Sequence, residues 1–423
     1  MIKKAVTPLL LVVVLVLTAN LSAQDKPLKV YLLVGQSNMQ GHAHVKTLAH
    51  MGMDESMKAV LEEIQDSSGT PKVVDDVWIS YLSAGVEKSG PLTTGFGAAD
   101  DKIGPELTFG IYMQKRLGEP ILIIKTAWGG KSINTDFRPP SAGPYVFHDA
   151  VLERLEKRGQ DIDKIKADKV KATGAYYRDT VAHVKKVLSN IEEVVPGYKE
   201  SQGYELAGLV WFQGWNDMVD SGTYPRRGEP GGYNAYSEVL THMIRDFRKD
   251  LDAPELPFVI GVMGVNGPTE QYTKQQQRYK KIHQGFRDAM AAPAMQEEFK
   301  SNVVNVLTEH YWDMELDRLV SRESTIRGTA RRLAKSGDSE KIIEAFAGGE
   351  EPSPAAKEEL ETLMKSRKFE RVLAEKMLSK EFSEREMLIL KNGKSNAAFH
   401  YFGCAKIMAG IGKGFADAMP IDQ

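Results

Sequence analysis

The sequence predicts an α/β protein in which a parallel sheet is covered by helices on both faces. Short runs rich in Val, Ile and Leu, typical of strands buried on both faces, lie at 28–34, 77–82, 121–126, 206–213, 258–263 and 303–308. Stretches with apolar residues at helical spacing separate them, at 107–117, 177–191 and 236–251. Alternation of strands and helices of this kind is typical of a doubly wound sheet.

Longer segments between these elements are interpreted as insertions, and they lie at 44–99, 137–173 and 312–396. The last is rich in Lys, Arg and Glu, and its apolar residues recur at helical spacing. This pattern predicts several amphipathic helices whose charged faces are solvated. Such helices near a site are also candidates for a lid or one wall of a cleft.

The chain returns to the core after this insertion, where Ile407, Ile411 and Phe415 fall four residues apart. That spacing predicts a terminal helix packed on the sheet. The predicted organisation is a signal peptide at 1–23, a core at 24–311, a helical insertion at 312–396 and a C-terminal core segment at 397–423.

The first residues are typical of a secretory leader. Lys3 and Lys4 precede an aliphatic run at 9–17, and small residues at 21–23 form a candidate cleavage site. We therefore expect a secreted or periplasmic protein without stable membrane insertion after cleavage, since no later segment is long and apolar enough to span. An uncleaved N-terminal anchor is the alternative.

Composition narrows the class of protein further. The 423 residues carry a formal net charge of −2, which gives no indication of a nucleic-acid partner. Cys404 is the only cysteine, so no intrachain disulfide is expected, and its apolar surroundings predict a core position. The oligomeric state is not indicated by the sequence.

Ser37 is the candidate nucleophile. The first apolar run ends in Gly-Gln-Ser at 35–37, so this serine follows the carboxyl end of a predicted strand. Open α/β sheets place their ligands at that edge. The alternative is that Ser37 only caps the helix that follows, which serine does well.

Two other strand ends carry candidate donors for an oxyanion. Gly129 and Gly130 follow the run at 121–126, and paired glycines let backbone N–H groups approach an anion. Gln213 and Asn216 follow the run at 206–213, and an amide side chain there can donate to an oxyanion. The alternatives are an ordinary tight turn and an Asx turn or helix cap.

The general base is expected to be a histidine, and His400 is the candidate because it directly precedes the terminal core helix. His42 and His44 alternate on a loop, but two histidines without a third clustered ligand do not make a metal site. No metal and no cofactor are therefore predicted.

The order of these blocks resembles the SGNH-hydrolase superfamily. They are Gly-Gln-Ser-Asn-Met at 35–39, Ala-Trp-Gly-Gly at 127–130, Trp-Phe-Gln-Gly at 211–214 and His400 before a final glycine-containing helix. Within the superfamily they are similar to the sialate O-acetylesterase and acetylxylan esterase branch, carbohydrate esterase family six. The three insertions have no counterpart that we assign.

The resemblance implies a flavodoxin-like three-layer α/β/α sandwich and metal-independent removal of O-acetyl groups from a carbohydrate. It implies Ser37 as nucleophile and His400 as general base. It also implies an oxyanion hole built from the Ser37 N–H, a glycine N–H at Gly129 or Gly130, and an amide side chain at Gln213 or Asn216.

This chain departs from the family pattern at two positions. Gly-Trp-Asn-Asp at 214–217 matches the superfamily, whereas the sugar-esterase branch more often has Gln-Gly-Glu, so the choice between Gln213 and Asn216 stays open. Ala397 also stands where the family has the catalytic aspartate. Asp313 is one substitute, a backbone carbonyl or Asn396 is another, and weak or absent activity is the third reading.

The sequence therefore predicts a secreted serine esterase that deacetylates a carbohydrate, with the sugar and its acetylated position left open. A non-catalytic carbohydrate-binding relative and a lipase-like esterase are the alternatives. Sugars stack on aromatic faces, and the candidates for such a face are Trp128, Trp211 and Trp215.

Overall fold

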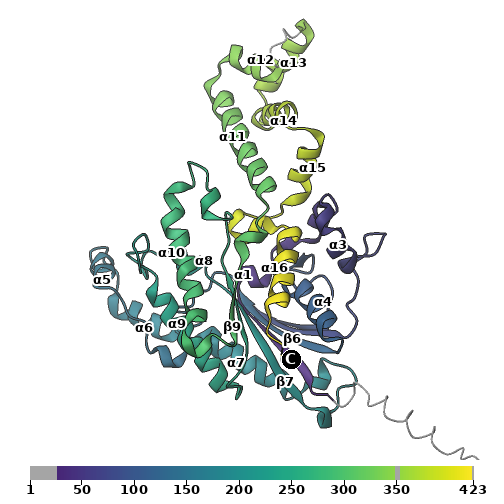
Figure 1. Cartoon of the computed structure of the whole chain (residues 1–423). Helices are drawn as coiled ribbons and strands as arrows, with labels where there is room; N and C mark the ends of the chain where they lie inside the picture. Colours follow the sequence, from purple (N-terminus) through teal and green to yellow (C-terminus); the bar gives the residue numbers. More distant parts are fainter. Residues whose placement is uncertain (1–25, 348–352, 422–423) are drawn as a thin grey trace, which may run out of the picture.

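The computed structural model describes residues 26–347 and 353–421 (Figure 1). The predicted signal peptide, 1–23, lies outside the described residues. Within those two ranges, no helix is both long and apolar enough to cross a membrane.

A seven-stranded sheet in the order β4-β3-β6-β1-β7-β8-β9 forms the centre of the molecule. Its strands are β1 (Leu28–Gln36), β3 (Val77–Ser83), β4 (Val86–Pro91), β6 (Ile121–Trp128), β7 (Tyr204–Phe212), β8 (Phe258–Val262) and β9 (Val303–Leu307). All neighbouring strands are parallel except β3 and β4, which form an antiparallel hairpin. Every predicted strand is confirmed. The polar edge strand β4 was not predicted, because its exposed residues lack an apolar run.

The strand order places a switch point at β1. The strands β6-β1-β7-β8-β9 follow the flavodoxin-like order 2-1-3-4-5, and the β3–β4 hairpin extends the β6 edge. The predicted fold class is therefore confirmed. Because β1 lies between β6 and β7, successive crossovers run to opposite sides of it, and its carboxyl end is where such sheets bind ligands.

β1 and β7 approach each other closely at this edge. Gly35 pairs with Ala127 of β6 and Phe212 of β7. A β-carbon on Gly35 would lie 2.1 Å from the carbonyl oxygen of Phe212, so only glycine fits there. The next residues of β1 are thereby held against the loops that follow β6 and β7.

Helices cover both faces of the sheet. One face carries α4 (Glu106–Leu117) and α16 (Ala405–Ala418), and the other carries α7 (Ala175–Leu188), α9 (Asn234–Asp250) and α10 (Lys280–Ala291) (Figure 1). The helices predicted at 107–117, 177–191 and 236–251 and the terminal helix are confirmed. The shorter elements are α1 (Ser37–Gln40), β2 (Ala43–His44), α2 (Leu48–Met51), α3 (Lys58–Ile64), β5 (Lys102–Ile103), α5 (Asp149–Glu156), α6 (Ile162–Ala172) and α8 (Trp215–Val219).

A helical arm projects from the core (Figure 1). It consists of α11 (Met314–Ser336), α12 (Ser339–Ala347), α13 (Pro354–Met364), α14 (Phe369–Glu381) and α15 (Glu384–Gly393). Its outer part has a small apolar cluster of its own, formed by Ala330, Ile342, Leu360, Phe369, Leu373 and Ala374. These are the amphipathic helices predicted for 312–396. The division of the chain into domains stays a prediction.

A buried ion pair supports the turn that follows β1. Lys125 of β6 is 0% exposed, and its Nζ lies 2.7 Å from Glu106 Oε2. The same Nζ donates to the carbonyl of Gln40, at the end of α1, and to that of Phe96. Burial lowers the pKa of Lys125, and the Glu106 carboxylate opposes this shift. The pair thus joins α1, α4 and β6.

We expect Lys125→Met to lower the free energy of unfolding by about 3–5 kcal/mol, because it leaves the Glu106 charge buried without a partner. Lys164→Met is the matched control, since Lys164 forms an exposed pair with Asp168 at 3.2 Å and should lose about 0.5 kcal/mol or less. Urea denaturation measures both. Equal midpoints for the two variants would contradict the assigned role of Lys125.

Candidate active site

Ser37 is the first residue of α1 and directly follows β1. Its side chain is 7% exposed, and its hydroxyl makes no hydrogen bond within the described part of the chain. Gln36 holds the N-cap position in an extended conformation, and no side chain caps the helix. The alternative of a capping serine is therefore wrong, and the hydroxyl is free for another partner.

The two glycines after β6 differ in their relation to Ser37. A β-carbon on Gly129 would lie 4.0 Å from Cβ of Ser37 and 3.1 Å from Oε1 of Gln40. Gly129 therefore borders the serine. Gly130 adopts a left-handed backbone with φ of +73°, and a β-carbon there would meet no atom within 4 Å. Gly130 thus turns the chain at the surface beside the serine.

His400 lies in a short 3-10 segment, Ala398–Gly403, that packs against α1. Asn38, the neighbour of Ser37, donates from Nδ2 to the carbonyl of Phe399 at 3.2 Å. Residues far apart in the sequence are thereby brought to one edge of the sheet. Tyr401 and Phe402 have positive φ values of 51° and 59°, and such strained backbone is common beside functional residues.

The hydrogen bonds of Asn396 fix the tautomer of His400. Nδ1 of His400 lies 3.0 Å from Oδ1 of Asn396, and the N–H of Ala397 donates to the same oxygen at 2.7 Å. A backbone N–H only donates, so this atom is the amide oxygen, and Nδ1 of His400 must carry the proton. Nε2 is then an acceptor, as a general base requires. It makes no hydrogen bond among the described residues, and catalytic contacts often tighten only with substrate.

Asp313 does not supply the missing carboxylate. It accepts hydrogen bonds from Nε2 of His50 at 2.8 Å and from Lys406 at 2.9 Å, and it caps α11 through the Leu316 N–H. Burial acts to raise the pKa of Asp313, but these partners together lower it below its usual range. The carboxylate follows β9 in sequence yet anchors the arm. Asn396, the other substitute considered, contacts His400.

His42 stacks on His400, with ring centroids 4.1 Å apart and planes within 5°. Burial lowers the pKa of His400 to about 4, and the positive charge of Lys102 acts in the same direction. Burial, then His400, Lys102 and Lys125, lower the pKa of His42 to about 4. Both imidazoles are therefore neutral at pH 7, and no carboxylate contacts either ring in the ranges described.

A chain of amide side chains links the ends of β1 and β7. Nε2 of Gln213 donates to Oδ2 of Asp217 at 2.5 Å and to Oε1 of Gln36 at 3.0 Å. Gln36 in turn donates from Nε2 to Oδ1 of Asn216 at 3.2 Å. The Asp217 carboxylate only accepts, so it must face the NH₂ group of Gln213. That orientation fixes the amide of Gln36, which in turn fixes the amide of Asn216. Nδ2 of Asn216 is left without a partner in the described chain, whereas both hydrogens of the Gln213 amide are used.

Asp217 joins the loops that follow β6 and β7. It is fully buried and accepts from the Ile133 N–H at 2.9 Å, from the Asn134 N–H at 3.3 Å and from the Tyr224 hydroxyl at 3.0 Å. Burial raises the pKa of Asp217 to about 6, against the lowering effect of these donors and of Gln213. The residue therefore fixes the loop that carries Gly129 relative to the amide chain.

Only one of the three candidate tryptophans is accessible. Trp128 and Trp211 are buried in the core at 5% and 0% exposure, so they offer no stacking face. Trp215 is half-buried and packs on Phe399, with ring centroids 5.4 Å apart and planes inclined by 30°. Phe399 is 38% exposed and directly precedes His400. Aromatic surface thus borders the histidine.

Other expected features bear less on the site. In the residues that the structure covers, no three His, Cys, Asp or Glu side chains converge as metal ligands would. His44 pairs with Asp101 at 3.2 Å, away from the stacked His42. Cys404 is buried, as predicted.

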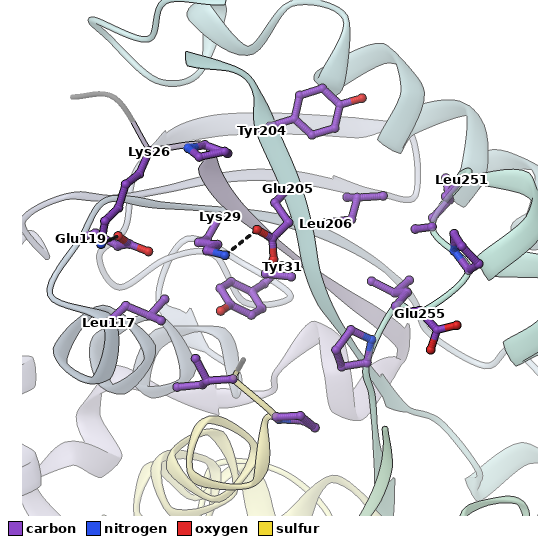
Figure 2. A pocket seen from close by; sticks show the side chains of 18 of the residues that line it. Lys26, Lys29, Tyr31, Leu117, Glu119, Tyr204, Glu205, Leu206, Leu251 and Glu255 are labelled. Atoms are coloured by element: carbon purple, nitrogen blue, oxygen red, sulfur yellow. Dashed lines mark hydrogen bonds and ion pairs between the residues drawn. The ribbon is translucent and has the colours of Figure 1, made fainter. Parts of the chain in front are cut away.

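A pocket of about 880 Å³ lies at the opposite end of the sheet (Figure 2). Its lining includes Lys29, near the start of β1, and Tyr204 and Glu205, at the start of β7. Lys29 pairs with Glu205 across it at 2.5 Å. Because β1 runs the full depth of the sheet between this pocket and Ser37, roughly 25 Å at the rise of a strand, the pocket is no part of the serine site.

The arrangement at the carboxyl end of β1 is suited to acyl transfer. A free hydroxyl, a neutral imidazole with Nε2 available and an unpartnered amide N–H are the parts that this chemistry needs. The sequence analysis gave no role in the serine site to Gln36, His42 or Lys102. Gln36 stands inside the Gly-Gln-Ser motif and His42 lies five residues after Ser37, so both carried a signal, whereas Lys102 carried none.

The family described as carbohydrate esterase, sialic acid-specific acetylesterase, matches residues 27–310. A search of curated proteins finds no match. A solved structure of a protein from Arabidopsis thaliana is 18% identical, with a TM-score of 0.36, over 67% of this chain and 86% of the other. A carbohydrate acetylesterase from Xanthomonas citri is 13% identical, with a TM-score of 0.36, over 66% of this chain and 49% of the other.

We expect His400 to titrate near pH 4 and to stay neutral above it, because burial and the Lys102 charge disfavour the imidazolium. Lys102→Gln should raise the pKa of His400 but leave it below 6.5, since burial is the larger cause. NMR titration of the His400 ring protons measures both values. Lys164→Gln, an exposed change on α6, should shift nothing. A wild-type value near 6.5 would contradict the described environment of His400.

Proposed function

We propose that this chain, which belongs to the sialic acid-specific acetylesterase family of carbohydrate esterases, is a serine esterase that removes O-acetyl groups from a carbohydrate. The observation that carries the proposal is the free Ser37 hydroxyl at the switch point of the sheet, on a helix that packs against the segment of a histidine whose Nδ1–H is held by Asn396. The leader predicted at 1–23 supports action outside the cytoplasm, in a secreted or periplasmic setting.

The first half of the reaction transfers the acetyl group to Ser37. Oγ of Ser37 attacks the acetyl carbonyl carbon while Nε2 of His400 takes the hydroxyl proton. The resulting tetrahedral oxyanion collapses, and the bond between the acetyl carbon and the sugar oxygen breaks. His400 gives its proton to that oxygen, so the deacetylated sugar leaves as a neutral hydroxyl.

The second half hydrolyses the acyl-enzyme. His400 takes a proton from water as the water oxygen attacks the acetyl carbon. Collapse of the second tetrahedral species breaks the bond to Ser37 Oγ, which recovers the proton from His400. Acetate leaves, and both residues return to their starting states.

Oxyanion donors come from three strand ends. We assign them to the Ser37 N–H, the Gly129 N–H and Nδ2 of Asn216. Gln213 is a positioning residue in this scheme, because its amide hydrogens are used by Asp217 and Gln36. The unpartnered Nδ2 of Asn216 supports the choice left open by the sequence.

His400 has Asn396, and no carboxylate from the described residues, as the partner of Nδ1, which limits the expected rate. Asn396 fixes the tautomer, as asparagine does in some cysteine proteases, but it carries no charge to stabilise the imidazolium. Replacement of the triad aspartate by asparagine in a serine protease lowers turnover by about 10⁴, a loss that includes the wrong histidine tautomer. We therefore propose a slow esterase. Ala397 also motivates the alternative of an inactive carbohydrate-binding relative.

Trp215 and Phe399 are proposed to bind the sugar ring next to the reacting acetyl group. Trp215 directly precedes Asn216 and Phe399 directly precedes His400, and Phe399 has an accessible face. Aromatic surface of this kind packs on the apolar faces of pyranose rings.

Replacement of Ser37 by Ala should reduce acetate release to background, and Asn216→Ala should lower kcat by about 10²–10³ through loss of one oxyanion donor. Acetate is measured after incubation with p-nitrophenyl acetate, O-acetylated sialic acid and acetylated xylan. Asn190→Ala, an exposed amide, should behave as wild type.

Equal slow release by wild type and Ser37→Ala would end the esterase proposal. Glycan binding without hydrolysis would then favour the binding alternative. Acyl-chain length is tested with p-nitrophenyl esters in the same assay. Faster cleavage of long-chain esters than of the acetate would contradict the proposed substrate class and favour a lipase-like enzyme.

Phe399→Ala should raise KM for acetylated glycans about tenfold, the loss of one aromatic contact, and leave KM for p-nitrophenyl acetate within about twofold. Tyr204→Ala removes an aromatic ring that is 44% exposed at the other end of the sheet, and it should change neither constant. Michaelis–Menten kinetics on both substrates decide the matter. A parallel rise for both substrates would argue against a sugar-binding role.

A further inference from the structure

His42 stacks directly on His400, and the proposed reaction does not use it. It follows α1 by two residues, and its ring lies parallel to that of His400 at 4.1 Å. The two segments are also joined through their backbones. Ser395 Oγ lies 3.4 Å from the carbonyl oxygen of His42, and a β-carbon on Gly403 would lie 2.7 Å from that oxygen. The position of the ring is therefore tightly constrained.

The amide of Asn396 bridges the two imidazoles. Its Oδ1 accepts from Nδ1 of His400, and its Nδ2 lies 3.5 Å from Nδ1 of His42. Because the Ala397 N–H identifies the oxygen, the group facing His42 is the NH₂. Nδ1 of His42 is therefore the acceptor in this contact, and His42 carries its proton on Nε2.

An amide differs from a carboxylate in that it can be turned over. Rotation of the Asn396 side chain by half a turn would present NH₂ to His400, which would favour the opposite tautomer and block Nε2 as a base. A carboxylate has two equivalent oxygens, so the same rotation would leave its contact with His400 unchanged. The Ala397 N–H marks the oxygen end of this amide, and Nδ1 of His42 is the contact at its NH₂ end.

We propose that His42 is a positioning residue that holds the Asn396 amide in the orientation that keeps the proton of His400 on Nδ1. This role rests on the proposed function in that it matters for catalysis only if His400 is the general base. The neutral His42 ring also lies face to face with the imidazolium that forms during the reaction, where a π face is favourable for a cation.

Two substitutions separate the acceptor from the ring. His42→Phe keeps a stacked ring and removes the acceptor, whereas His42→Gln removes the ring and keeps an acceptor oxygen. Imidazole ¹⁵N shifts of His400 at pH 7 report the tautomer. We expect Nδ1–H in wild type and in His42→Gln, and a mixture of both tautomers in His42→Phe.

Kinetics on p-nitrophenyl acetate supply the second readout. His42→Phe should lower kcat about tenfold, as expected for one lost neutral hydrogen bond, with KM within about twofold. His42→Gln should restore most of this loss. Unchanged tautomer and kcat in His42→Phe would overturn the proposal, and a loss of kcat in His42→Gln alone would show that the ring matters only for packing.

Asn396→Asp gives a test that does not depend on how well the single variants fold. A carboxylate needs no orientation, so His42→Phe in the Asn396→Asp background should cost less than about twofold in kcat. The same tenfold loss in both backgrounds would overturn the proposal. The tautomer measurement needs no substrate, so it stands even if Ser37→Ala shows that the chain is not an esterase.

Discussion

The hydrogen bond between Nδ1 of His400 and Oδ1 of Asn396 is the contact on which the rest of the site depends. It leaves Nε2 of His400 as an acceptor that makes no hydrogen bond among the described residues. Asn396 is neutral, so it orients the His400 ring but places no negative charge beside it. Burial and the nearby Lys102 keep the imidazole neutral at pH 7, and no carboxylate among the described residues contacts the ring to raise its pKa. The base is therefore available but weak.

Two buried charges hold the surroundings of this contact in place. Lys125 joins the end of α1 to β6, and Asp217 joins the loops after β6 and β7. Each is satisfied by several hydrogen bonds, which a buried charge requires. Neither the Asp217 carboxylate nor the Lys125 ammonium reaches the reacting atoms. Their common effect is to fix the loops that carry Ser37, Gly129 and Asn216, and such rigid support is what a preorganised site needs.

The sequence was sufficient for the sheet because its strands are buried on both faces and read as uninterrupted apolar runs. β4 was not predicted from the sequence because it is a polar edge strand. The sequence also predicted that the segments of Ser37 and His400 lie at one edge of the sheet, and α1 does pack against the 3-10 segment that carries His400. It left Gln213 and Asn216 undecided because their amide orientations depend on Gln36, which is 177 residues from Gln213. Asp313 was misjudged because its place after β9 says nothing about which side chains lie around it.

The helical arm precedes His400 in the sequence, yet it need not disturb the position of His400, because the base of the arm is packed firmly against the core. α15 ends at Gly393, and a β-carbon there would lie 2.9 Å from Leu316 of α11 and 3.3 Å from His50 of α2. Asp313 links the start of α11 to the same His50. The start of α11 and the end of α15, where the chain enters and leaves the arm, are therefore packed on one another and on the core. The outer helices pack around an apolar cluster of their own, so their packing does not involve the loop that carries His400. Asn396 and His42 can then be aligned by local contacts alone.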